Sequence, residues 1–154
     1  MNKEHNKNKI SLTTIEADHD IDATYDIMKQ LRTSLDKNDY VRNINKMRNH
    51  QKNYSLVGAF LEGRKNQYIA VIGFSYDFRL SVGQMIYIED LVVDKNYQNL
   101  GIGKKLMDHV EIIARKKGIK TLVLDSAIHR KEAHKFYDKI GFVNTSNNYK
   151  KFLD

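Results

Sequence analysis

Cysteine is absent from the 154-residue chain, which excludes disulfides, thiolate metal sites and a cysteine acyl-enzyme intermediate. The same absence fits the cytoplasmic protein that we expect, without requiring one. Proline is also absent, so the ends of loops must be inferred from glycine, asparagine and aspartate. No apolar run approaches the roughly 18 residues that a membrane helix needs. We therefore expect no membrane partner.

The N-terminal residues 1–9 are rich in asparagine and lysine and have no hydrophobic stretch behind them. This pattern is not that of a signal peptide, and it predicts a flexible leader. The hydrophobic share of 41% and the charged share of 29% are ordinary for a globular protein. Residues 10–154 are long enough for one hydrophobic core but not for two, so we predict a single domain.

Basic residues outnumber acidic ones by 26 to 19, which gives a formal net charge of +7. The excess indicates either a solvated lysine-rich surface or attraction to a phosphorylated cofactor or nucleic acid. The lysines are spread along the chain and do not form a basic helix with interleaved aromatics, so we expect no nucleic-acid partner. The six histidines show no metal-ligand spacing, and we expect no metal.

Hydrophobic periodicity predicts the secondary structure of the first ninety residues. An edge strand is indicated at Ile10–Ile15, where apolar and hydroxyl side chains alternate. Apolar residues at helical spacing predict one helix over 21–35 and a second through Val41, Ile44 and Met47. A meander of three antiparallel strands follows at 54–61, 67–76 and 84–93, with turn residues between the strands.

The remaining residues predict a strand–helix–strand unit and a further helix. The unit comprises residues 84–93, a helix over 101–117 ending at Gly118, and a strand at 121–124. Its two strands should be parallel neighbours. Another helix is predicted over 130–139, followed by short strands at 142–143 and 149–153. The fold class is therefore α/β, a mixed sheet of about six to seven strands with helices on both faces.

One stretch, residues 88–106, organises the rest of the chain. It is typical of a strand, a polar turn, a glycine-punctuated loop and the start of a helix. Gly101 and Gly103 leave the backbone bare where the helix begins, and its free N–H groups and dipole favour a phosphate. The charges of Lys104 and Lys105 oppose the helix dipole, which is understandable if an anion binds between the two lysines. The alternative for the two glycines is a plain tight turn, and the alternative for the two lysines is a solvated helix face. Two known phosphate-binding motifs, the P-loop and the dinucleotide-binding fingerprint, do not match this segment.

Two sequence blocks resemble the GNAT superfamily of N-acetyltransferases. Gln98-Asn99-Leu100-Gly101-Ile102-Gly103 resembles the family signature Gln/Arg-x-x-Gly-x-Gly/Ala. The block from Arg130 to Phe142 is similar to the family element Ala-x-x-Phe-Tyr-x-x-x-Gly-Phe. Together they cover the cofactor half of the chain, whereas the acceptor half matches only in the order of its elements.

The resemblance implies the GNAT fold and direct acetyl transfer from acetyl-CoA, a co-substrate, to a primary amine of a small molecule (a polyamine or amino sugar) or a peptide. A silent acetyl-CoA-binding sensor is the alternative, and a homodimer is possible because similar sequences often dimerise. Arg130 stands where many members carry asparagine, and its role stays open between the pantetheine arm and a cofactor phosphate. The cofactor-binding residues implied are Leu91, Val92, Val93, Gln98, Asn99, Leu100, Gly101, Ile102, Gly103, Lys104, Arg130 and Phe136.

The resemblance also implies catalytic roles. Tyr137 is the candidate general acid that protonates the coenzyme A thiolate, the alternative being a core aromatic. An alkylammonium has a pKa near 10.4, so presenting the free amine at pH 7 costs about 4.6 kcal/mol. Glu89 is the predicted base, acting through water, and Asp90 is either the base or a ligand of a cationic acceptor. Strict strand alternation would place these two carboxylates on opposite faces, so that only one faces the acceptor.

Overall fold

The computed structural model describes residues 9–50 and 53–153, so the predicted leader lies almost wholly outside the described residues. The chain divides into two compact units, of which the first ends at Val123 and the second begins at Leu124. Within the described ranges, no helix is both long and apolar enough to cross a membrane.

A five-stranded mixed α/β arrangement confirms the predicted fold class. The strands follow one another in the sheet as they do in the sequence, β1-β2-β3-β4-β5. The predicted meander is present, because β1 to β4 pair antiparallel. β4 and β5 are neighbours as predicted, and the Ile86 amide donates to the Thr121 carbonyl at 3.1 Å; their parallel direction stays a prediction. The bounds are β1 (Ile10–Thr14), β2 (Ser55–Leu61), β3 (Tyr68–Arg79), β4 (Gly83–Val93) and β5 (Leu122–Leu124).

The strands predicted at 142–143 and 149–153 are wrong, and the total is five where six to seven were expected. These segments carry no regular structure, and Val143, Tyr149 and Phe152 are exposed. The physical reason is that alternating apolar residues mark a segment able to pair, whereas a strand forms only where a neighbouring strand offers its hydrogen-bonding edge.

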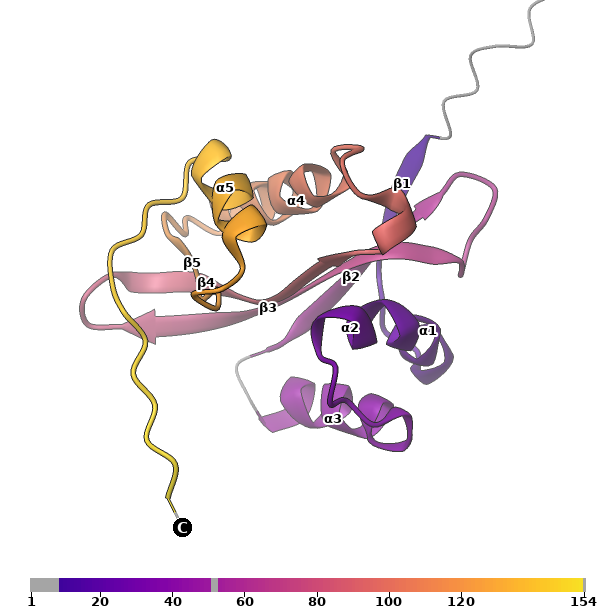
Figure 1. Cartoon of the computed structure of the whole chain (residues 1–154), viewed down its shortest axis with the longest axis horizontal. Helices are drawn as coiled ribbons and strands as arrows, with labels where there is room; N and C mark the ends of the chain where they lie inside the picture. The colour runs from indigo at the N-terminus through magenta and orange to yellow at the C-terminus, as the bar shows by residue number, and fades with distance from the viewer. Residues whose placement is uncertain (1–8, 51–52, 154) are drawn as a thin grey trace, which may run out of the picture. The chain divides into compact units, whose positions relative to one another are not determined.

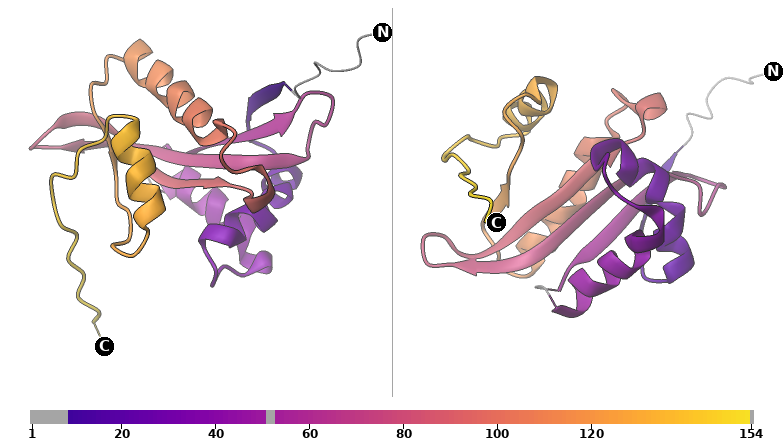
Figure 2. Two further views of the ribbon diagram at one scale, coloured as in Figure 1. Left: turned by 45° about the horizontal axis from the view of Figure 1, so that its top comes forward. Right: turned by 60° about the horizontal axis from the view of Figure 1, so that its bottom comes forward.

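Helices cover both faces of the sheet in the first unit (Figure 1). The helices α1 (Asp18–Ala23), α2 (Tyr25–Leu31) and α3 (Lys37–His50) lie on one face, and α4 (Ile102–Lys116) lies on the other, as Figure 2 also shows. The single helix predicted over 21–35 is in fact divided at Thr24. The Thr24 hydroxyl donates to the Ile21 carbonyl at 2.7 Å and lies 2.9 Å from the Tyr40 hydroxyl, a local bond that competes with helix continuation.

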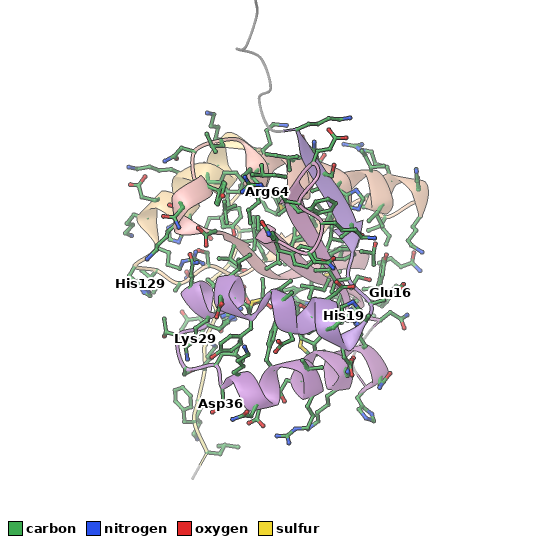
Figure 3. The ribbon with its side chains drawn as sticks, turned by 90° about the vertical axis from the view of Figure 1, so that its right-hand side faces the viewer. Glu16, His19, Lys29, Asp36, Arg64 and His129 are labelled. Carbon is green, nitrogen blue, oxygen red and sulfur yellow. The ribbon has the colours of Figure 1, made fainter. Side chains whose placement is uncertain are left out.

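The two predicted helices are separated in the structure, and polar contacts hold the turn between them. Lys29 of α2 donates to the Leu35 carbonyl at 2.6 Å, and Asp36 accepts from the Asn38 amide at 2.8 Å. Figure 3 shows Lys29 and Asp36 together on the helical layer. The turn between α2 and α3 is therefore fixed, and it places Arg32, the residue after α2, near the sheet. The second unit contains one helix, α5 (Lys131–Lys139).

Candidate active site

The start of α4 presents an open set of backbone amides. Gly101 precedes the helix in the left-handed conformation, with φ 75° and ψ 11°. No side chain caps this end, and the first turn contains no acidic residue. A Cβ placed on Gly101 would meet nothing within 4 Å. The first N–H groups of α4 can therefore bind an anion, which the helix dipole also favours. We call residues 98–104 the helix mouth.

One carboxylate sets the path of the chain from β4 to the helix mouth. Asp94 accepts from the Asn96 amide at 2.8 Å and so caps a short 3₁₀ turn, η1 (Lys95–Tyr97). The bond from the Asn96 amide holds the pKa of Asp94 below its usual value against the opposing effect of burial, and a 2.9 Å bond from Gln30 lowers it further. Asn99 then adopts a positive φ of 62°, which asparagine tolerates better than most residues. The loop is thus ordered before α4 begins.

The side chains at the start of α4 do not converge on the free backbone amides. Leu100 is exposed, whereas Ile102 is buried in the core. Lys104 pairs with Asp108 one turn along the helix at 2.7 Å, and Lys105 donates to the Ile10 carbonyl of β1 at 2.6 Å. The structure therefore differs from the expectation that an anion docks between the two ammonium groups. The groups of the helix mouth that are available to an anion are therefore its backbone N–H groups.

The end of β4 offers backbone groups on the side facing away from β3. The Asp94 amide donates to the Ile69 carbonyl at 2.8 Å. Because antiparallel pairs alternate in their bonding, Val92 also directs its backbone to β3, whereas Leu91 and Val93 direct theirs away. The Val92 side chain is buried in the core. Leu91 and Val93 are therefore arranged as an extended chain pairing with β4 requires.

A β-bulge places Glu89 and Asp90 on the same face of the sheet. Gly73 lies opposite Asp90 and Phe74 lies opposite Ile88, so Glu89 is the extra residue. Asp90 shares the face of its partner Gly73, and Ser75, two residues further along β3, shares it too. The Ser75 hydroxyl donates to Glu89 Oε1 at 2.6 Å. The expectation that the two carboxylates face opposite sides is therefore wrong, because the bulge interrupts the alternation.

This shared face is the one covered by α1 to α3. Val71 and Val92 lie opposite each other and belong to the core cluster formed with these helices. Gly73 and Asp90 are two residues from them along β3 and β4, so they point to the same side. We call Arg32, Tyr54, Ser75, Glu89 and Asp90 the bulge cluster.

Arg32 distinguishes the two carboxylates of the bulge cluster. Its Nε donates to Asp90 Oδ1 at 2.6 Å, and its Nη2 donates to the Glu89 backbone carbonyl at 2.9 Å. Asp90 is thus paired with a cation, whereas the Glu89 carboxylate accepts a hydrogen bond from the neutral Ser75 hydroxyl. Of the two carboxylates, Glu89 is therefore the one that forms no ion pair among the described residues, which suits a proton acceptor.

Tyr137 lies on α5, in the second unit. Its ring contacts those of Phe136 and Phe142 edge to face, with centroids 5.3 and 5.7 Å apart. Burial raises the pKa of Tyr137, and the charge of Arg130 opposes part of that rise. The phenol is therefore protonated at neutral pH and can donate a proton. Arg130 favours the phenolate that the donation would leave behind.

The residues described include no group of three or more histidine, aspartate or glutamate side chains close enough to hold a metal ion.

Two cavities open on the first unit, of 560 and 330 Å³. Tyr76 lines both, whereas neither Glu89 nor Asp90 lines either of them. The carboxylates thus lie outside these hollows.

Residues 21–142 match the acetyltransferase (GNAT) family. The chain belongs to this family. It is 33% identical over 129 residues to the uncharacterized N-acetyltransferase YhdJ of Bacillus subtilis (strain 168), covering 83% of this chain and 88% of that protein. It is 27% identical over 138 residues to glucosamine 6-phosphate N-acetyltransferase 1 of Dictyostelium discoideum, covering 86% and 84%. The solved structure of aminoglycoside N-acetyltransferase AAC(6′)-Iy in complex with CoA has the same fold, with a TM-score of 0.79 at 15% identity over 94% and 95% of the chains.

The protein is thus a GNAT N-acetyltransferase, an acyltransferase that depends on acetyl-CoA. The helix mouth, uncapped and free of acidic residues, fits the diphosphate of coenzyme A. The outward backbone groups of Leu91 and Val93 fit its pantetheine arm, which is extended and carries amides.

The sequence interpretation of this GNAT chain missed three members of the bulge cluster. Arg32 follows a helix as an ordinary surface cation would. Tyr54 begins an apolar strand in which a tyrosine is unremarkable. Ser75 had the clearest signal, because it is a buried hydroxyl that follows the apolar run of β3.

Proposed function

We propose that this GNAT enzyme transfers the acetyl group directly to a primary amine of a small molecule, with amino sugars as the first class to test. The observation that carries the proposal is the bulge cluster: Glu89, without a paired cation, lies beside Asp90, which Arg32 bonds through Oδ1. Glu89 can accept a proton, while Asp90 can help to hold a cationic acceptor through its other oxygen, Oδ2. Relatives named for glucosamine 6-phosphate and a structural neighbour named for aminoglycosides support amino sugars.

In this proposal the cofactor is bound mainly by backbone. Amides of the helix mouth bind the diphosphate, and Leu91 and Val93 bind the pantetheine arm. Val92 contributes to cofactor binding indirectly. Its backbone is directed to β3 and its side chain is buried in the core, so it holds β4 in the sheet. Phe136 of α5 and Arg130, the residue before that helix, are proposed to contact the cofactor as well. The amides of the helix mouth are those of Gln98, Asn99, Leu100, Gly101, Ile102, Gly103 and Lys104.

The proposed reaction is a direct transfer in three steps. The acceptor ammonium first loses a proton to Glu89 through a water molecule; presenting the free amine at pH 7 costs about 4.6 kcal/mol for an unperturbed amine. The neutral amine then attacks the thioester carbon, the carbon–sulfur bond breaks, and the nitrogen releases its second proton to water to leave a neutral amide. Tyr137 finally protonates the leaving thiolate. Because the chain has no cysteine, no cysteine acyl-enzyme precedes the transfer.

The test is release of coenzyme A thiol from acetyl-CoA over a panel of amines. The panel contains glucosamine, glucosamine 6-phosphate, an aminoglycoside, spermidine and a peptide with a free N-terminus. We expect turnover with at least one amino sugar. Turnover with spermidine or the peptide alone would keep the enzyme class and refute the acceptor class. A rise in melting temperature with coenzyme A but no turnover with any amine would favour the sensor.

A further inference from the structure

Tyr54 has a buried hydroxyl without a hydrogen-bond partner. The residue precedes β2, is 4% exposed, and belongs to the core cluster under α1 to α3. Among the described residues, none accepts from or donates to its hydroxyl. Two other tyrosines of this cluster do have partners: Tyr40 bonds to Thr24 at 2.9 Å, and Tyr68 to Asp20 at 3.3 Å. Since buried polar groups are nearly always bonded, the Tyr54 hydroxyl requires a partner of another kind.

The position of this hydroxyl is set by a glycine of β3. A Cβ added to Gly73 would lie 2.0 Å from Tyr54 Oη and 2.7 Å from Cζ. The hydroxyl therefore occupies space that any other residue at 73 would fill. Gly73 is the partner of Asp90, at the register shift that makes Glu89 the extra residue. Tyr54 Oη thus lies against β3 beside the bulge, on the face to which both carboxylates point.

The charges around Tyr54 favour a neutral, donating hydroxyl. Burial, mainly, raises the pKa of Tyr54 well above its usual value, and the negative charges of Asp90 and Glu89 raise it further. Arg48 of α3 acts in the opposite sense but does not reverse the shift. The phenol therefore keeps its proton across the working pH range. It is an O–H donor that lacks an acceptor, in the field of two carboxylates.

We propose that Tyr54 is a positioning residue whose hydroxyl holds the water through which the acceptor ammonium passes its proton to Glu89. This inference rests on the proposed function. In the step, one N–H bond of the ammonium breaks and its proton bonds to the water. The water gives another proton to the Glu89 carboxylate, so the products are a neutral amine and a neutral carboxylic acid. Tyr54 keeps its own proton and donates a hydrogen bond to the water, which makes the water a better donor to Glu89.

The test compares Tyr54→Phe with the matched control Tyr68→Phe, each of which removes one hydroxyl from the same core cluster. For Tyr54→Phe we expect kcat to fall about tenfold, part of the roughly 10²- to 10⁴-fold that general base catalysis contributes. The KM for acetyl-CoA and the melting temperature should not change. For Tyr68→Phe we expect no change in turnover.

A pH profile separates a positioning role from a structural one. Losing the donor disfavours the ionised form of the proton acceptor, so the acidic limb of kcat/KM should move up by roughly half a pH unit in Tyr54→Phe. The other polar and charged groups around Glu89 and Tyr54 stay in place in both variants. Ser75 bonds the Glu89 carboxylate, Arg32 bonds the Glu89 carbonyl and Asp90, and the charges of Asp90 and Arg48 and the hydroxyl of Tyr40 act on Tyr54.

Three results would overturn the inference. These are unchanged turnover and pH profile in Tyr54→Phe, an equal loss in Tyr68→Phe, or a loss accompanied by a lower melting temperature, which would indicate packing alone. A crystal structure of the coenzyme A complex gives a result that does not depend on turnover. A water bonded to both Tyr54 Oη and Glu89 supports the inference, and a hydroxyl bonded elsewhere refutes it. If the wild type acetylates no amine, the proposed function fails, and that result is distinct from any of these.

Discussion

The helix mouth and the bulge cluster are built in opposite ways. The helix mouth uses backbone amides of consecutive residues, 98–104, and its side chains are exposed, buried or paired elsewhere. The bulge cluster uses side chains from widely separated parts of the chain, such as Arg32 and Asp90, which are 58 residues apart. A backbone site needs only glycines at fixed spacing, so it leaves a short signature in the sequence. A side-chain site depends on the whole fold, so its arrangement leaves no such signature.

Replacing the proposed base should have the largest effect. We expect Glu89→Gln to lower turnover by about 10²- to 10⁴-fold at neutral pH, because the amide cannot accept the ammonium proton. Affinity for coenzyme A, measured by calorimetry, should stay as in the wild type. The control is Glu111→Gln on α4, which removes a carboxylate paired with Arg115 at 3.6 Å. Full activity in Glu89→Gln would assign the base to another residue, with Asp90 the first to test.

Removing the proposed acid should have the next largest effect. Tyr137→Phe keeps the aromatic contacts with Phe136 and Phe142 but cannot protonate the thiolate, so turnover should fall by about 10²-fold or more. Tyr149→Phe, at an exposed tyrosine of the same unit, should behave as the wild type. Thiol release at saturating acetyl-CoA measures both. Equal activity in the two variants would mean that Tyr137 only packs.

A matched pair of glycines tests the helix mouth. Gly101 and Gly83 both have φ 75° and open space around the Cβ position, but only Gly101 precedes α4. Alanine at either position should cost about 1 kcal/mol of folding free energy, the strain of the left-handed conformation. Gly101→Ala alone should also weaken coenzyme A binding, by about tenfold if that strain displaces the amides. An equal loss of affinity in Gly83→Ala would contradict this account.

The smallest expected effect concerns Arg32. Arg32→Lys keeps the positive charge but cannot bond Asp90 and the Glu89 carbonyl together as the guanidinium does. Because the pair is partly exposed, its loss should be worth no more than about 1 kcal/mol. We expect the KM for the acceptor amine to rise about threefold and the KM for acetyl-CoA to stay constant. A change confined to acetyl-CoA would separate Arg32 from the acceptor face.

The same contrast explains what sequence patterns could predict. The helix over 101–117 and the meander were predicted because apolar spacing in α4, β2, β3 and β4 matches one face of each element. The break at Thr24 was missed, because it depends on contact with Tyr40, 16 residues away. The strands at 142–143 and 149–153 were predicted wrongly, because the pattern does not show whether a pairing edge is present.

In the candidate site, Glu89 and Asp90 were named from the resemblance, but their arrangement was not predicted. Sequence alternation gives opposite faces, and the bulge that reverses this depends on pairing with Gly73 and Phe74. The role of Tyr54 was not predicted either, because the position of its hydroxyl depends on its contact with Gly73 of another strand.

The most direct test of the central claim is a titration of the ¹⁵N-labelled protein with coenzyme A, followed by amide NMR. If backbone groups at the start of α4 bind the diphosphate, the amides of Gly101 to Lys104 should show the largest shifts. Pantetheine, which lacks the diphosphate, should leave those amides unmoved while shifting Leu91 and Val93. Saturable binding of coenzyme A with no change at Gly101 to Lys104 would contradict the account.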